Sequence, residues 1–76
     1  MIKTKKNIKV NLDKLKNMRE SHGYSVSDIA LTLGYKTPTG YWMLEKGSRQ
    51  CSIDALYTLS ELYGCEMKEL LIQVND

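Results

Sequence analysis

The sequence has few of the residues that metal centres and enzymes require. It contains one histidine and two cysteines among 76 residues, and Cys51 and Cys65 form no Cys-x-x-Cys pair. Because a tetrahedral zinc site takes four Cys- or His-type ligands at close spacing, we expect no metal site and no cofactor. No Gly-rich phosphate loop, Ser-x-x-Lys or Gly-x-Ser-x-Gly motif accompanies His22. A nucleophile needs a base beside it, so we do not expect an enzyme.

Long apolar runs are also missing. No stretch reaches the roughly 18 apolar residues of a membrane span, and no apolar segment with a small-residue cleavage site follows the first lysines, as in a signal peptide. A helix over residues 52–63 would separate the two cysteines by roughly 18 Å, beyond the ~7 Å between Cα atoms that a disulfide allows. We therefore expect reduced, buried cysteines and a cytoplasmic protein.

The small net charge of +2 conceals an uneven distribution. Residues 1–49 hold ten Lys or Arg and four acidic residues, giving +6, whereas residues 50–76 hold one lysine and five acidic residues, giving −4. The first region could therefore face a polyanion, and the second could not.

Capping residues divide most of the chain into five expected helices. The helices are expected to start at Asn11, Ser25 (with Asp28 as a variant capping box), Thr37-Pro38 and Ser52, and to end at His22-Gly23, Gly34, Gly47 and Gly64; the fifth is expected from about Met67 to Val74. The pattern predicts a compact, all-α domain of five helices over residues 11–76.

The first ten residues differ from the rest, because they contain four lysines and no acidic residue. Residues 1–10 are expected to form a short basic arm or strand. Three interpretations stay open: a tail without regular structure, an arm that follows the DNA backbone or minor groove, and a strand at Ile8-Lys9-Val10 that pairs across a dimer.

Four blocks of sequence resemble the Cro/repressor-type (lambda-repressor-like, XRE class) helix-turn-helix family. The likeness covers about three quarters of the chain. The blocks are Leu15 to Gly23 with Arg19; Gly23-Tyr24-Ser25 with Ile29-Ala30 and Leu33-Gly34; Leu44-Glu45-Lys46-Gly47-Ser48-Arg49; and Ser52-Ile53-Asp54-Ala55-Leu56 with Leu59, Leu62-Tyr63-Gly64, Met67 and Glu69-Leu70-Leu71. The resemblance implies a structural ion pair between Arg19 and Glu45 that ties two helices together.

The resemblance also implies a sequence-specific, DNA-binding regulator of transcription, in which the helix over residues 37–46 enters the major groove. Its partners would be double-stranded DNA with a palindromic operator and a second copy of the chain, and its simplest action is repression. The implied phosphate contacts are Ser25, Lys36, Lys46, Ser48 and Arg49, and the implied base contacts are Thr39, Trp42 and Met43. Leu71, Ile72 and Val74, expected on the last helix, are candidate dimer contacts.

The chain departs from the family pattern at the motif itself. Val26 stands where the family often has glutamine, and the turn before residue 37 is one residue longer, with Lys36 as the insertion. The expected base-contacting face lacks Arg, Asn and Gln, which make bidentate contacts to guanine or adenine. Trp42 could pack against the core or the phosphate backbone, contact bases or sugars, or anchor a protein partner.

These departures favour a second interpretation. The same scaffold could be a protein-interaction module, such as an antirepressor or an inhibitor of a nucleic-acid enzyme, with Trp42, Met43 and Tyr35 as its contact patch. The clustering of Lys36, Lys46 and Arg49 at the motif argues for DNA instead. Five helices would use nearly all 76 residues, so we expect no effector domain.

Overall fold

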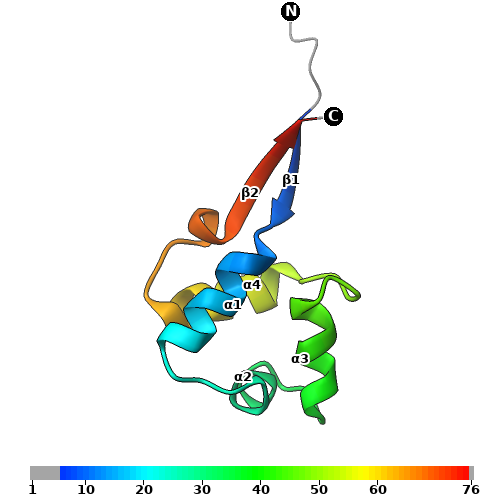
Figure 1. Cartoon of the computed structure of the whole chain (residues 1–76), viewed down its shortest axis with the longest axis vertical. Coiled ribbons are helices and arrows are strands. Elements are labelled where there is room, and N and C mark those ends of the chain that lie inside the picture. Colours follow the sequence, from blue (N-terminus) through cyan, green and yellow to red (C-terminus); the bar gives the residue numbers. More distant parts are fainter. Residues whose placement is uncertain (1–5, 76) are drawn as a thin grey trace, which may run out of the picture.

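The computed structural model of the protein describes residues 6–75. Four α-helices, one 3-10 helix and two strands follow one another in it (Figure 1). In chain order they are β1 (Lys6–Val10), α1 (Leu12–Ser21), α2 (Val26–Thr32), α3 (Pro38–Glu45), α4 (Ile53–Tyr63), η1 (Met67–Leu70, the 3-10 helix) and β2 (Leu71–Asn75). No helix in this range is long and apolar enough to cross a membrane.

The predicted fifth helix is wrong: the described residues are mostly helical, but they form four α-helices and a short two-stranded sheet. Only one turn of 3-10 helix forms, at Met67–Leu70, and the chain then becomes strand β2. The segment Leu71-Ile72-Gln73-Val74 combines β-branched residues with alternating polarity, which suits a strand when a partner is available. That partner is β1, which pairs with β2 in antiparallel register from Lys6 opposite Asn75 to Val10 opposite Leu71.

The first strand changes the interpretation of the basic N-terminal segment. Ile8, Lys9 and Val10 do form a strand, but they pair with β2 of the same chain. Residues 6–10 are therefore neither a tail without regular structure nor a separate arm. The part of the predicted arm over residues 1–5 lies outside the described residues.

The first four helices begin at the predicted residues, and in three of them a capping side chain satisfies free N–H groups of the first turn. Asn11 accepts from the Lys14 N–H at 3.2 Å and Ser52 from the Ala55 N–H at 3.1 Å. Ser25 and Asp28 form a reciprocal capping box. Thr37 makes no side-chain cap hydrogen bond, and its helix begins with Pro38.

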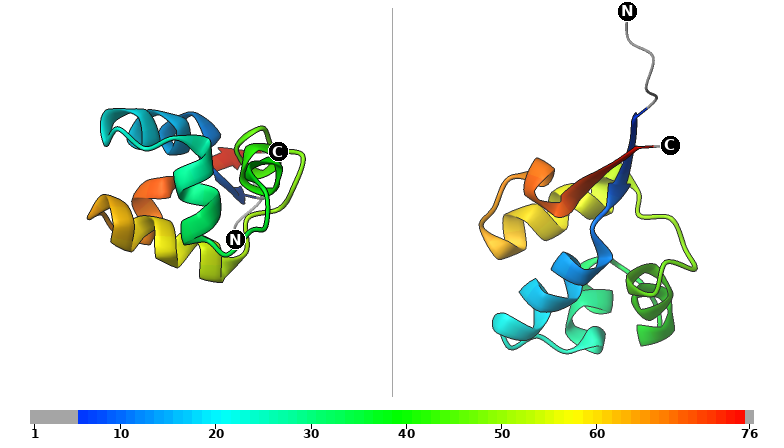
Figure 2. Two further views of the ribbon diagram at one scale, coloured as in Figure 1. Left: turned by 90° about the horizontal axis from the view of Figure 1, so that it is seen from below. Right: turned by 45° about the horizontal axis from the view of Figure 1, so that its top comes forward.

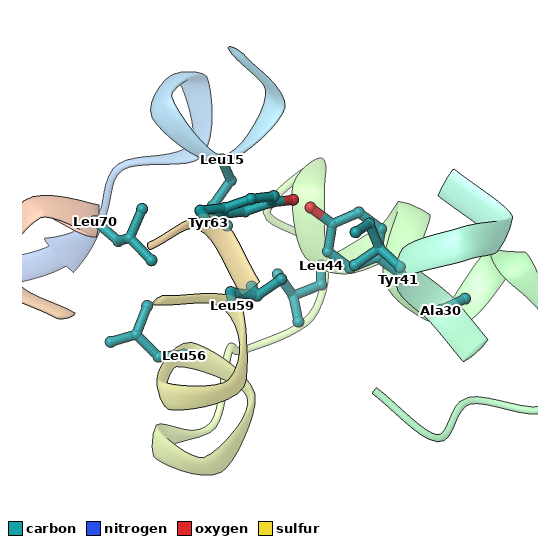
Figure 3. Packing of buried hydrophobic residues seen from close by; sticks show 9 residues of the cluster. Leu15, Ala30, Tyr41, Leu44, Leu56, Leu59, Tyr63 and Leu70 are labelled. Atoms are coloured by element: carbon teal, nitrogen blue, oxygen red, sulfur yellow. The ribbon is translucent and has the colours of Figure 1, made fainter. Parts of the chain in front are cut away.

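A single core joins the helices (Figure 3). Six large side chains are fully buried, one or two from each helix: Leu15, Ile29, Tyr41, Leu44, Leu59 and Leu70. The buried Ala30 is small, which suits the close packing of α2 against α3. Cys51 and Cys65 are free and only partly buried, and burial raises the pKa of both thiols.

The two strands stand apart from this core. Figures 1 and 2 show β1 and β2 as a two-stranded ribbon that projects from the helices on the side opposite α2. Only its base, at Val10 and Leu71, packs against the core.

Candidate nucleic-acid interface

The helices α2 and α3 form a helix-turn-helix unit (Figure 2). Gly34 takes a φ of +85°, a left-handed conformation that glycine adopts without steric cost. The Tyr35 N–H then donates to the Ala30 carbonyl at 2.9 Å. The Tyr35 ring packs directly on Gly40, where a Cβ would lie 2.6 Å from Cδ1 of the ring. These contacts fix where α3 starts relative to α2.

An ion pair fixes the other end of α3. Arg19 on α1 donates from Nε and Nη2 to the two carboxylate oxygens of Glu45, each at 2.9 Å. The side chains are 12% and 10% exposed, and Nη1 of Arg19 also donates to the Tyr24 carbonyl at 3.2 Å. Burial raises the pKa of Glu45, but the Arg19 guanidinium outweighs it and holds that pKa below its usual value. The structure thus brings together the two residues of the implied pair.

Tyr41 holds the inner face of α3 against the core, in which its side chain is fully buried. Figure 3 shows the hydroxyl groups of Tyr41 and of Tyr63 from α4 directed at one another. Burial raises the pKa of Tyr63 to about 12 and raises the pKa of Tyr41 as well, so both hydroxyls stay neutral. With Leu44 also fully buried, the inner face of α3 belongs to the core.

The three implied base-contacting residues occupy the rest of α3. Thr39 is exposed and Met43 is partly buried. Trp42 is 48% exposed and is not part of the core cluster. Its ring lies 4.8 Å from the Lys46 ammonium, at a groove that Leu12, Lys16 and Val26 also line. Trp42 therefore packs only partly against the body, and about half of its side chain is open to solvent.

The implied phosphate-contacting residues surround α3 and the start of α2. Lys36 lies exposed in the turn before α3, Lys46 is its C-cap residue, and Ser48 and Arg49 are exposed in the following loop. The Arg49 guanidinium lies over the Tyr35 ring at 5.1 Å. This contact joins the loop after α3 to the turn before it, so basic residues flank both ends of the helix.

Ser25 is differently placed from the other four. Its hydroxyl accepts from the Asp28 N–H at 3.0 Å, and its own N–H donates to the Asp28 carboxylate at 2.8 Å. The Ser25 N–H that donates to the carboxylate lowers the pKa of Asp28. A negative side chain therefore already occupies the N-terminus of α2, where a phosphate would otherwise bind.

Sequence reasoning missed Lys16 as a member of this surface. Lys16 lies three residues before Arg19 on α1, so both side chains share one helix face, and both line the groove beside Trp42. Their spacing along a helix that was correctly predicted is the signal that could have identified it.

The comparisons with known proteins agree with this geometry. A helix-turn-helix family model matches residues 15–70, which span the segment from within α1 to the end of η1. A comparison with curated proteins gave no match. The family match indicates a DNA-binding regulator of transcription. With its helix-turn-helix unit, its Arg19–Glu45 pair and this match over about three quarters of its length, the chain belongs to the Cro/repressor-type helix-turn-helix family.

Proposed function

We propose that the protein is a sequence-specific DNA-binding regulator that places α3 in the major groove. One observation carries the proposal: α3 is fixed to the body on its inner face and at both ends, while its outer face is open. Lys36, Lys46 and Arg49 flank that open face. A rigid exposed helix between basic residues is what major-groove recognition by a helix-turn-helix protein requires.

The basic residues supply most of the binding free energy in this proposal. Lys46 and Arg49 would contact phosphates on one side of the groove, with Ser48 between them, and Lys36 would contact the other side. Each neutralised phosphate releases counterions, so the affinity falls as salt rises. Because Asp28 caps α2, the contribution of Ser25 would be the smallest of the implied set.

The outer face of α3 would read bases mainly by shape and apolar contact. Trp42 and Met43 can contact thymine methyl groups, and the Thr39 hydroxyl can hydrogen-bond to a base edge. None of the three forms the bidentate contacts that Arg, Asn or Gln make. We therefore expect a preference for thymine-containing sites over one fixed guanine-rich sequence.

The regulator would act as a homodimer on a palindromic operator, because two copies related by a two-fold axis contact two half-sites. Occlusion of a promoter is the simplest action for such a complex, so we propose a repressor without catalytic activity. The free state of Cys51 and Cys65 supports a reducing compartment, the cytoplasm.

A specific observation favours a second candidate function. Trp42 is half exposed beside a groove that Leu12 and Val26 help to line, and exposed tryptophan is a frequent anchor at protein interfaces. The alternative is a protein-interaction module, an antirepressor or an inhibitor of a nucleic-acid enzyme, on the same scaffold. The positive charge of Lys36, Lys46 and Arg49 around α3 favours DNA over this alternative.

The test is selection from a random duplex library at low and moderate salt, with wild type beside Lys46→Glu/Arg49→Glu. We expect the wild type to enrich a sequence and the variant to enrich none. Lys14→Glu/Lys68→Glu is the matched control, since it changes the net charge equally on α1 and η1, and it should retain the enriched sequence. If the wild type enriches no sequence and the charge reversal changes nothing, the proposal is wrong.

A further inference from the structure

A groove, called here the β1 groove, separates β1 from the loop that joins α3 to α4. In Figures 1 and 2, β2 lies along one edge of β1, and this loop lies beyond the other edge. The groove has a volume of about 400 Å³. Apolar residues of the strand, the loop, α1 and α3 line it: Ile8, Val10, Leu12, Leu44 and Cys51. Ile8 is 58% exposed, so the groove presents apolar surface to solvent.

The charge around the β1 groove has one sign. Two basic residues, Lys9 and Arg49, border it, and no acidic residue of the described range lines it. The Arg49 guanidinium lies over the Tyr35 ring, whereas Lys9 is exposed and forms no ion pair within residues 6–75. An ammonium group therefore stands beside apolar surface without a negative partner. A ligand with an acidic side chain between apolar ones is complementary to this surface.

The backbone of β1 adds hydrogen-bonding groups to the same groove. The Asn11 N–H donates to the Leu70 carbonyl at 2.9 Å, which extends the β1–β2 register by one pair. An antiparallel ladder bonds every second pair, so Lys9 directs its backbone groups toward β2, and Ile8 and Val10 direct theirs away from it. The N–H and C=O groups of Ile8 and Val10 thus form an open strand edge along the groove.

The apolar surface, the ammonium group and the open strand edge fit one kind of ligand. We propose that the β1 groove binds an extended, acidic segment of a partner protein, which adds to the sheet as a third strand beside β1. Such strand addition takes its affinity from main-chain hydrogen bonds and its specificity from alternate side chains.

An antiparallel segment has a defined pattern. It forms hydrogen-bonded pairs with Ile8 and Val10 and a non-hydrogen-bonded pair with Lys9. Side chains of directly opposed residues approach most closely in a non-hydrogen-bonded pair. The residue opposite Lys9 is therefore acidic, and its two neighbours, opposite Ile8 and Val10, are apolar.

The same lysine disfavours a second copy of β1 as the occupant. Antiparallel pairing of two β1 strands about Lys9 would set two ammonium groups opposite one another, which is destabilising. Lysine on a strand edge is a common means of preventing pairing between copies. Lys9 thus repels the wrong partner and attracts a carboxylate, which gives the edge its selectivity.

The position of the groove predicts an effect on DNA binding, and this part rests on the proposed function. Gly47 and Arg49 line the groove, and Ser48 between them is an implied phosphate contact. A negatively charged segment in the groove lies beside the loop that would face the DNA backbone, so it should compete with the duplex. The partner would release the regulator from its operator. Binding of the segment itself can be measured without DNA.

A nuclear magnetic resonance titration of the isotope-labelled protein locates the segment. The probe is the capped peptide Thr-Val-Glu-Val-Thr, and Thr-Val-Lys-Val-Thr is its matched control. We expect the glutamate peptide to shift the amide resonances of Ile8, Val10 and Gln50, and the lysine peptide to bind at least about tenfold more weakly. Shifts at Ile72 and Val74 of β2 in their place, or no shifts with either peptide, would overturn the proposal.

A charge exchange tests the role of Lys9. Lys9→Glu should weaken binding of the glutamate peptide about tenfold and strengthen binding of the lysine peptide, because the opposed charges are exchanged. Lys68→Glu makes the same change at an exposed lysine of η1 and should leave both affinities unchanged. A Lys9→Glu variant that still prefers the glutamate peptide would contradict the pairing.

Proline at the strand edge tests the third strand. Ile8→Pro removes an N–H that points away from β2, a position at which a strand tolerates proline, and it should abolish peptide binding. Ile8→Ala keeps this N–H and should retain part of the affinity, and circular dichroism verifies that both variants fold. N-methylation of both valines of the glutamate peptide removes the matching donors without changing the protein. Full binding of the methylated peptide would show that no third strand forms.

The failure of this inference is distinguishable from that of the proposed function. If the duplex library yields a sequence but no peptide binds, only the inference about the β1 groove is wrong. If the peptides behave as expected but no duplex binds, the inference holds and DNA binding fails. If the duplex shifts the Ile8 and Val10 resonances and the glutamate peptide does not, DNA occupies the groove and the inference is wrong.

Discussion

The helical body (residues 11–70) and the ribbon (β1 with β2) are stabilised in different ways. In the body, side chains from every helix are removed from water in one core, and caps satisfy the free backbone groups of the helix starts. In the ribbon, Ile8, Ile72 and Val74 remain exposed. Apolar burial contributes roughly 25 cal/mol per Å², so nearly all of the folding free energy comes from the body.

The difference separates two tasks. The body can hold α3 rigidly without help from another chain, because its core and the Arg19–Glu45 pair are complete within one copy. The ribbon adds little to that core and offers an uncharged edge. The proposed recognition of DNA therefore depends on the body, whereas the ribbon contributes little to the core. The following predictions test this division.

The largest effect is expected in the core. Leu59 is fully buried, so Leu59→Ala should reduce the free energy of unfolding by about 3 kcal/mol through lost apolar contact and a cavity. Leu31, which is 75% exposed on α2, is the matched control. Leu31→Ala should change the free energy of unfolding by less than ~0.5 kcal/mol. In the ribbon, Ile72→Ala should cost the monomer less than ~1 kcal/mol. Denaturant unfolding measures all three, and an equal loss at residues 59 and 72 would contradict the division.

A smaller loss in the free energy of unfolding is expected when the ion pair between Arg19 and Glu45 is broken. Arg19→Ala leaves the Glu45 carboxylate partly buried and without its partner, which should cost about 2 kcal/mol and lower the melting temperature by roughly 8–16 °C. Arg49→Ala removes only an exposed contact with Tyr35 and should cost less than ~1 kcal/mol. An unchanged melting temperature of Arg19→Ala would show that the pair does not hold α1 to α3.

The smallest effect concerns pH. The pKa of Glu45 is lowered in the folded state, so its contribution to stability is complete above its usual pKa of 4.5 and is lost as pH falls below that value. The melting temperature of wild type should exceed that of Glu45→Gln from pH 7 to about 5 and approach it near pH 3. The exposed Glu61→Gln provides the control. A difference between wild type and Glu45→Gln that stays constant down to pH 3 would contradict the assignment.

The body was predictable from local signals, and the ribbon was not. Asn11, Ser25, Ser52 and Gly64 act on neighbouring backbone groups, so their effect is visible within a few residues of sequence. The segment from Leu70 to Val74 is apolar at spacings that fit a helix as well as a strand. Its conformation is decided by pairing with β1, more than 60 positions away. The strand at Ile8-Lys9-Val10 was one of the interpretations of the sequence, but the identity of its partner leaves no local signal.

The candidate site was predictable to a similar degree. The resemblance placed Arg19 with Glu45 and placed Thr39 on α3, because family spacing carries that information. The exposure of Trp42 depends on how α1 and Val26 on α2 pack around it, and the use of Ser25 as a cap for Asp28 competes with a phosphate contact. Residue type alone determines neither of them. The exposure of Trp42 follows from tertiary packing, and the role of Ser25 follows from a local hydrogen bond within the helix cap.

Trp42 is the only tryptophan of the chain, so its fluorescence reports directly on α3. The most direct test of the central claim, that α3 binds DNA, is a fluorescence titration with the selected duplex at several salt concentrations. We expect a change in Trp42 fluorescence and a slope of log affinity against log salt of about −4 or steeper for each bound copy. Lys46→Glu/Arg49→Glu should make that slope shallower by about 2. Unchanged fluorescence together with an affinity independent of salt would contradict the account.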